Sequence, residues 1–410
     1  MGISKQICLT FKEHGLKLIL LLLMLISIMS PWHIYIKDVL SFFLLYIVAR
    51  GSYDKTSIQL CLFSFAYSLF VFINNSVSIT ELLSYLICPI SFYLLGQKIF
   101  RESSSEDDLV TVFILIILAS NVILWINNIT DSIQHGIVNV SRVIENDTQR
   151  DISATLQGLI LSIGISGVAY VIVCGSIFNW KSLMMLCFSL LSLFSTIHLV
   201  NRTGMGIFAI AVIVSMLYMF RKKKIYIILS IVIMYVVYLL LNHYGIINEE
   251  VFEAYEARSF DQNTGGGRIE IWSVSFVELL NNPLGWTGVE IGFSKGFCHN
   301  LWLDIARRAG WIPFILFTII TIRKILELIK LALHSNKPFV GYFTAFITCT
   351  LTTCFLEPVI EGVSIYFYLL CFLWGIQSDL YKTNIQINEK NRFFSKWTCR
   401  KYYASHKILY

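Results

Sequence analysis

Two arginines and one histidine, widely separated along the chain, are the side chains best suited to chemistry. Arg202 lies between two apolar runs, Arg268 follows three consecutive glycines, and His299 precedes the apolar run that starts at Leu301. A guanidinium keeps its charge at any working pH and can bind a phosphate through two parallel hydrogen bonds. An imidazole can accept and release a proton near neutral pH. The three residues therefore indicate a site that binds a phosphate-like anion and moves a proton.

The residues around Arg268 predict the start of a helix. Apolar side chains recur every three to four residues after Arg268, and Asn281-Asn282-Pro283 would end the helix that they define. Free backbone N–H groups and the positive end of the helix dipole favour an anion at such a start. The apolar side chains that mark one side of this helix are Ile269, Trp272, Phe276 and Leu279.

Each of the three residues also has a structural interpretation, which the sequence leaves open. Arg202 could extend from a tight turn to the membrane surface. Arg268 could be a solvated residue of a flexible loop, and His299 could pack at the membrane interface. Cys298 is the neighbour of His299, but adjacent residues on a helix do not face each other, so a Cys–His nucleophile pair is not expected.

Further polar residues follow in the same region and after it. Asn300, Arg307 and Arg308 are candidate substrate-binding residues. Alternatively, the two arginines anchor the next helix, with Asp304 four residues before Arg308 in the favourable order for an ion pair. A last pair of carboxylates, which flanks Pro358 at a turn between two apolar runs, could recognise a hydroxyl group, although its role stays open: Glu357 and Glu361.

The composition excludes an ordinary soluble domain. Of the 410 residues, 56% are hydrophobic and only 14% are charged, and the mean hydropathy is +0.69, whereas soluble domains have about 25% charged residues. The net charge of +6 comes from short basic clusters between apolar runs, so no nucleic-acid partner is expected. The ten cysteines form no CxxC pattern, which argues against a disulfide framework or a zinc site.

Charge-free windows predict an all-α, polytopic membrane helical bundle of about twelve transmembrane helices. A spanning helix needs about 20 apolar residues, and the two short windows, 39–49 and 309–322, would have to include flanking charged residues. The windows are 18–36, 39–49, 56–80, 82–97, 109–130, 152–180, 182–201, 203–220, 225–248, 309–322, 339–356 and 362–378.

The distribution of Lys and Arg predicts that both termini are cytoplasmic. With the amino terminus inside and the loops alternating, most of the 32 basic residues fall on the cytoplasmic side, as the positive-inside rule requires. The basic residues that remain on the outer side each need a separate explanation: Lys37, Arg142, Arg150, Arg202, Arg258, Arg268, Lys295, Arg307 and Arg308.

We therefore expect residues 1–410 to form a single integral membrane domain. Residues 243–309 are expected to form a large external loop that carries the candidate residues, because binding groups concentrate on loops held by a scaffold. Residues 381–410 are expected to form a basic cytoplasmic tail.

Four segments in order resemble the O-antigen ligase and O-antigen polymerase (Wzy-type) superfamily. The resemblance is strongest over residues 198–325. It is carried by Asn201-Arg202-Thr203-Gly204, by Gly267-Arg268-Ile269-Glu270-Ile271-Trp272, by Asn282-Pro283-Leu284-Gly285-Trp286-Thr287-Gly288, and by His299-Asn300-Leu301-Trp302-Leu303 followed by Ala309-Gly310-Trp311. Many relatives have serine where this chain has Asn201, which leaves the hydrogen bonding around Arg202 open.

The resemblance implies a GT-C-like glycosyltransferase of the bacterial inner membrane with its active site facing the periplasm. The donor and acceptor would be undecaprenyl-diphosphate-linked oligosaccharides, and no metal or other cofactor would be needed. The family's two arginines and its histidine fall on Arg202, Arg268 and His299. These residues would neutralise the departing diphosphate and remove the proton of the attacking hydroxyl.

The sequence leaves three functions open. A polymerase and a ligase share this donor and differ in acceptor, which is another lipid-linked repeat unit or a sugar of the lipid A core. A compact outer loop and the absence of extra basic residues on the acceptor side favour the polymerase, for which a chain-length regulator is a possible partner. A transporter of the same lipid is less expected, because transporters place ionisable groups near the midplane of the bilayer.

Overall fold

A computed structural model describes residues 53–74, 77–138, 143–144, 151–174, 179–220, 235, 239, 253–256, 268–287 and 297–384. The predicted spans at 18–36 and 39–49 lie outside these residues, as do the span at 225–248 except for residues 235 and 239, part of the external loop, and nearly all of the predicted tail. The prediction of about twelve spans is therefore tested only over the described part of the chain.

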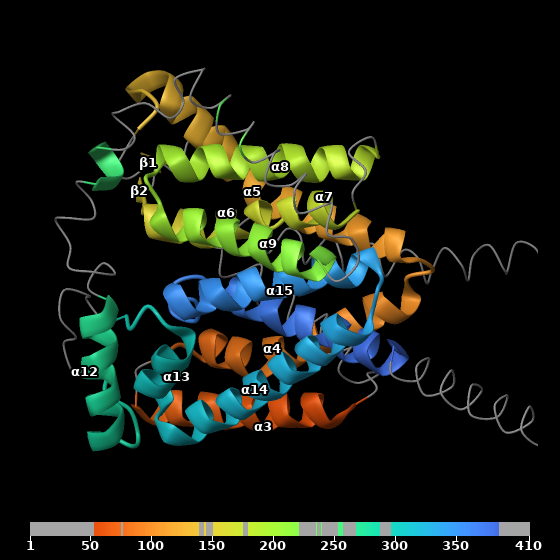
Figure 1. Ribbon diagram of the computed structural model, residues 1–410. Helices are drawn as coiled ribbons and strands as arrows, with labels where there is room; N and C mark the ends of the chain where they lie inside the picture. Colours follow the sequence, from red (N-terminus) through yellow and green to blue (C-terminus); the bar gives the residue numbers. More distant parts are fainter. Residues whose placement is uncertain are drawn as a thin grey trace, which may run out of the picture.

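The described part is an all-helical bundle with one minimal pair of strands (Figure 1). Strand β1 (Val143–Ile144) pairs antiparallel with β2 (Asp151–Ile152). A further helix covers residues 364–384. The helices of the bundle are α3 (Lys55–Asn74), α4 (Ile79–Glu102), α5 (Glu106–His135), α6 (Ala154–Ile165), α7 (Val168–Cys174), α8 (Trp180–His198), α9 (Arg202–Phe220), α12 (Arg268–Asn281), α13 (Leu301–Ala309), α14 (Trp311–His334) and α15 (Pro338–Leu356).

Seven helical segments of the described residues are long and apolar enough to cross a membrane, with α6 and α7 together forming one of them. They are α3, α4, α5, α6–α7, α8, α9 and α15, and each coincides with a predicted window. The window 152–180 is not one continuous helix, because a turn at Ser166-Gly167 separates α6 from α7. The chain is a multi-pass membrane protein.

The short window 309–322 belongs to a longer helix than expected. Helix α14 continues to His334, beyond the charged residues that follow the window. These charges are tolerated because they are paired within the helix: Glu327 accepts from Arg323 Nε at 3.0 Å and from Lys324 Nζ at 2.8 Å.

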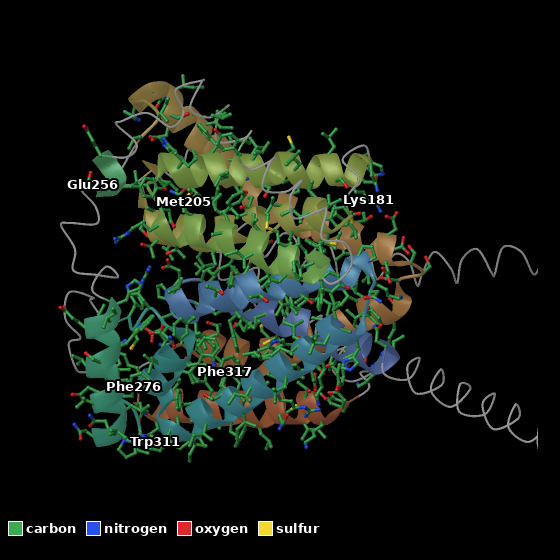
Figure 2. The ribbon with its side chains drawn as sticks, viewed as in Figure 1. Lys181, Met205, Glu256, Phe276, Trp311 and Phe317 are labelled. Atoms are coloured by element: carbon green, nitrogen blue, oxygen red, sulfur yellow. The ribbon has the colours of Figure 1, made fainter. Side chains whose placement is uncertain are left out.

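Polar contacts divide the bundle into two ends. At one end, Lys181 pairs with Asp107 and Lys337 pairs with Glu106, which brings the starts of α5, α8 and α15 together. Helix α12 lies across the opposite end, roughly perpendicular to the long helices (Figure 1). Figure 2 shows Lys181 far from Phe276 and Trp311, which mark that opposite end. Lys181 and Lys337, both predicted to be cytoplasmic, therefore lie at the end of the bundle opposite to α12.

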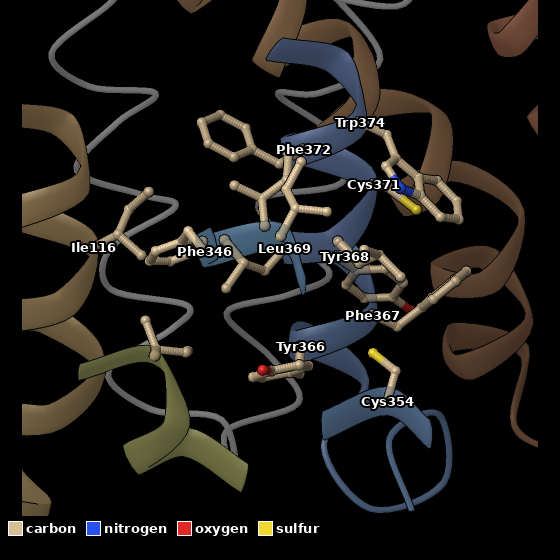
Figure 3. Packing of buried hydrophobic residues seen from close by; sticks show 14 of the residues in the cluster. Ile116, Phe346, Cys354, Tyr366, Phe367, Tyr368, Leu369, Cys371, Phe372 and Trp374 are labelled. Atoms are coloured by element: carbon tan, nitrogen blue, oxygen red, sulfur yellow. The ribbon is translucent and has the colours of Figure 1, made fainter. Parts of the chain in front are cut away.

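The helix over residues 364–384 forms the centre of the core. Figure 3 shows its side chains between neighbouring helices, with Phe346 of α15 beside Leu369. Phe367 and Trp374 both pack against Phe317 of α14, with ring centroids 5.6 Å apart in each pair. Close packing of this kind holds membrane helices together, because lipid tails are as apolar as the side chains they would replace.

Candidate active site

Glu357, at the carboxyl end of α15, is the centre of the candidate site. Its side chain is 1% exposed. One carboxylate oxygen, Oε1, lies 2.9 Å from Nη2 of Arg268 and accepts a hydrogen bond of 2.6 Å from Oγ1 of Thr203. The same nitrogen of Arg268 lies 3.4 Å from Oγ1 of Thr203. A buried carboxylate thus joins the first residue of α12 to the second residue of α9.

His299 faces the other oxygen of the same carboxylate. Its Nδ1 lies 3.8 Å from Oε2 of Glu357, which is an ion-pair distance but too long for a hydrogen bond. Neither atom makes a hydrogen bond within the described part of the chain. His299 also has a positive φ of 50°, which a non-glycine residue adopts rarely and at a cost in free energy.

The segment around His299 is held by the helix that follows it. Asn300 caps α13, because its Oδ1 accepts from the backbone N–H groups of Trp302 and Leu303. Its Nδ2 donates to the carbonyl of Phe355 at 3.2 Å, close to Glu357 in sequence. Asp304 lies within α13, and its Oδ1 accepts a hydrogen bond of 2.7 Å from the backbone N–H of Cys298, which precedes the helix. These bonds fix the backbone on both sides of His299.

A tight turn places Arg202 at the same end of the bundle. The turn joins α8 to α9 and contains Val200, with a φ of 49°. Asn201 then accepts from the N–H of Gly204 at 2.8 Å and donates to the carbonyl of Ala154 at 2.7 Å, which fixes the start of α9 against α6. Asn201 thus supplies the cap at the start of α9. Arg202 is adjacent to Thr203, which contacts Glu357.

Helix α12 has the predicted ends, and its predicted apolar side packs only in part. Its buried side chains are Ile271, Ser275 and Leu279, and Trp272 donates from Nε1 to the carbonyl of Cys298 at 2.9 Å. Ile269 and Phe276 are exposed. The predicted side therefore contributes Leu279 and Trp272 to the packing, and Ile271 and Ser275 complete the buried face.

Three helix starts meet at this carboxylate: α9 through Thr203, α12 through Arg268, and α13 through the segment before Asn300. Helix starts carry positive partial charge and free N–H groups, and Arg268 adds a full positive charge. A negative group is therefore favoured here, and in the structure Glu357 supplies it.

Arg307 and Arg308 belong to a second polar cluster, around Glu361. Glu361 lies 3.5 Å from Nη1 of Arg307 and 3.8 Å from Nε of Arg308. Nη1 of Arg308 also lies 3.3 Å from Glu81 and 2.8 Å from the hydroxyl of Tyr85, both on α4. The predicted ion pair between Asp304 and Arg308 is wrong, because Asp304 is fully buried and points back to the Cys298 backbone.

Burial sets the protonation of three neighbouring groups outside the spans. Burial, together with nearby Asp304, raises the pKa of the Cys298 thiol. This raised pKa disfavours the thiolate form of Cys298. Burial also raises the pKa of Asp304, which the nearby charge of Glu361 raises further, and burial raises the pKa of Glu361 itself.

The structure therefore brings Arg268 and His299 together through Glu357, with Arg202 at the neighbouring helix start. Asn300 acts there as a helix cap, and the other two predicted binding residues pair with Glu361. Sequence reasoning left the role of Glu357 open and did not single out Thr203. The available signal was a carboxylate next to Pro358 at the end of an apolar run, because such an acid at a helix end needs a cationic partner.

Comparison with known families gives one match over this region. Residues 186–318 match the family model described as O-antigen ligase. The matched region includes Arg202, Arg268 and His299, and it ends before Glu357. No curated protein matches the chain significantly. This match supports the resemblance of residues 186–318 to the O-antigen ligase and polymerase superfamily.

Proposed function

We propose that the protein is a membrane glycosyltransferase that polymerises undecaprenyl-diphosphate-linked repeat units of an O-antigen or capsular polysaccharide. The observation that carries the proposal is the convergence of Arg268 and His299 on the buried Glu357, next to the helix start that bears Arg202. A cationic site with an imidazole beside it suits a reaction that releases a diphosphate and consumes a hydroxyl proton.

In the proposed reaction, a sugar hydroxyl of the acceptor attacks the anomeric carbon of the donor. The new carbon–oxygen bond forms as the bond to the diphosphate breaks, and the bonding electrons leave with the lipid diphosphate. His299 takes the hydroxyl proton as general base, while Arg202 and Arg268 neutralise the leaving group. A single displacement inverts the configuration at the anomeric carbon. The permanent guanidinium charges supply the neutralisation, so the proposed reaction uses no metal.

The site residues are tested by glycan chain length in cells. We expect Arg268→Ala, His299→Ala and Arg202→Ala each to abolish or strongly shorten the polymer while the protein is still expressed. His334→Ala is the matched control, because His334 is exposed at the end of α14 and bonds only the Lys330 carbonyl among the described residues. Polymer of normal length in all three site variants would remove the proposal.

The ligase is the second candidate, because the family model that matches is described as O-antigen ligase. A deletion strain separates the two functions. A single repeat unit attached to the lipid A core indicates a missing polymerase, whereas a core with no repeat unit indicates a missing ligase. In favour of the polymerase, Arg307 and Arg308 both face Glu361, so they add little free positive charge for a phosphorylated core.

We further propose that the site faces the periplasm and that both termini are cytoplasmic. Glu256 is exposed and lies near the end of the bundle that carries the site (Figure 2), while Ser104 is exposed at the opposite end. In intact cells, a membrane-impermeant thiol reagent should label Glu256→Cys and not Ser104→Cys, with labelling of both after lysis. The reverse pattern would contradict this orientation.

A further inference from the structure

We propose that Glu357 is a carboxylate switch: it occupies the anion position at Arg268 when no donor is bound, and it moves to His299 when a diphosphate binds. Glu357 would thus be a positioning residue whose contact with the general base depends on the donor. The inference rests on the proposed function and adds a control step to it.

The two oxygens of Glu357 are in different situations. Oε1 has two partners, Arg268 and Thr203, whereas Oε2 makes no hydrogen bond within the described part of the chain. Nδ1 of His299 makes none there either, and the two atoms are 3.8 Å apart. Buried polar atoms without partners are unfavourable. A shift of less than about 1 Å would bring them to hydrogen-bond distance, so this pair is poised to form a bond that the described arrangement lacks.

A diphosphate and Glu357 would compete for the same group. Nη2 of Arg268 donates to Glu357 in the structure, and the proposed function requires that guanidinium to bind the donor. A diphosphate carries more negative charge than a carboxylate and would repel Glu357 at close range. Glu357 also caps the carboxyl end of α15, where the helix dipole disfavours an acid. After losing Arg268, the carboxylate needs another cationic or N–H partner, and Nδ1 of His299 is near.

The new contact would prepare His299 for catalysis. A carboxylate that accepts from Nδ1–H keeps the proton on Nδ1 and leaves Nε2 free to take the acceptor's proton. It also stabilises the imidazolium that forms, as the orienting carboxylate does in other histidine-based sites. The base would therefore be fully oriented only when the donor diphosphate is in place.

Glu357→Gln tests the switch in the full-length protein, reconstituted in lipid with an undecaprenyl-diphosphate-linked repeat unit. The amide keeps an oxygen for Arg268 and Thr203, but it cannot supply a negative charge to His299. We expect kcat to fall about a hundredfold or more, while KM for the donor stays unchanged or decreases. Inorganic diphosphate, used as a probe, should inhibit the variant at lower concentration than the wild type. The glutamine that competes with diphosphate for Arg268 carries no negative charge.

Two comparisons make the result specific. Glu278→Gln on α12 is the control, since Glu278 bonds Asn282 in the same helix and lies outside the site. In a His299→Ala background, Glu357→Gln should cause little further loss, because the residue it positions is absent. If the glutamine variant does not fold, Glu357→Asp replaces it: a shorter carboxylate should keep the donor KM and lower kcat.

The outcomes separate the switch from the proposed function. A wild-type kcat in Glu357→Gln, with Arg268→Ala and His299→Ala inactive, overturns the switch and leaves the function standing. A raised donor KM with unchanged kcat also overturns the switch, because it would make Glu357 a binding residue. Full activity of Arg268→Ala and His299→Ala overturns both.

Discussion

Gly158 of α6 lies directly against the side chain of Asn201, and a Cβ at residue 158 would overlap the Asn201 amide. Asn201 cannot move aside freely, because it bonds the Ala154 carbonyl and the Gly204 N–H. The start of α9, which bears Arg202 and Thr203, therefore depends on the absence of a side chain on another helix.

We expect Gly158→Ala to lower transferase activity more than it lowers the amount of folded protein, because the added methyl group shifts the α9 start. Overpacking of this kind typically costs about 1–3 kcal/mol. Gly206→Ala is the control, since a Cβ there meets no atom within 4 Å. Activity per folded molecule should be measured for both variants, and equal activity would show that the site tolerates the shift.

The helix over residues 364–384 packs on α4 through a reciprocal pair of glycines. A Cβ at Gly96 would overlap the Phe372 carbonyl, and a Cβ at Gly375 would overlap the Tyr93 carbonyl. Small residues allow membrane helices to approach this closely. We expect Gly96→Ala or Gly375→Ala to lower the thermal stability of the purified protein in detergent by several degrees, far more than Gly206→Ala. A Tm equal to that of the control would contradict this packing.

The sequence could predict the elements of the site, but not their contacts. Glycines before Arg268 and the Asn-Asn-Pro segment after Leu280 mark the ends of α12, so its bounds follow from local chemistry. Trp272 of α12 donates to the carbonyl of Cys298, a contact between residues 26 apart in sequence that no periodicity encodes. Glu357 lies 154 residues from Thr203 along the chain, and only the packing of α9 against α15 brings them together.

Sequence spacing also predicted a wrong ion pair, because tertiary contacts determine the partners of Asp304 and Arg308. Asp304 and Arg308 have the spacing of a helical ion pair, but surface spacing rules assume that both side chains are exposed. Asp304 is instead on the buried side of α13, where the backbone of Cys298 offers it a donor. Arg308 instead pairs with Glu81 of α4 and with Glu361 in the turn after α15, both remote in sequence.

Asn300→Ala should weaken both the fold and the reaction. The variant loses the cap of α13 and the bond to the Phe355 carbonyl, and the loss of a cap typically costs about 0.5–2 kcal/mol. Because His299 immediately precedes the cap, we expect kcat to fall while the donor KM changes less. Asn281→Ala, an exposed position at the end of α12, is the control. Lower stability with unchanged kcat would show that the cap does not position His299.

The buried carboxyl group of Asp304 gives a prediction for pH. Burial, with the nearby charge of Glu361 adding to it, raises the pKa of Asp304 in the folded protein, so the folded state holds this proton more tightly than the unfolded state does. The contribution of Asp304 to the free energy of unfolding is therefore present at low pH. It is lost as the pH rises above the ordinary carboxyl pKa of about 4. Asp304→Asn keeps an oxygen for the Cys298 N–H and removes the titration.

We therefore expect the Tm of the wild type to decline more steeply than that of Asp304→Asn between about pH 4 and pH 8, with the variant at least as stable at neutral pH. The measurement is thermal unfolding in detergent at a series of pH values. Asp108→Asn is the comparison, because Asp108 is exposed at the start of α5, where hydrogen bonds from Ser104 and Ser105 lower its pKa. Removal of the Asp108 carboxylate should not reduce the decline of Tm with pH. A Tm–pH slope that is the same in wild type and Asp304→Asn would contradict the prediction, because it would mean that Asp304 is ionised in the folded protein.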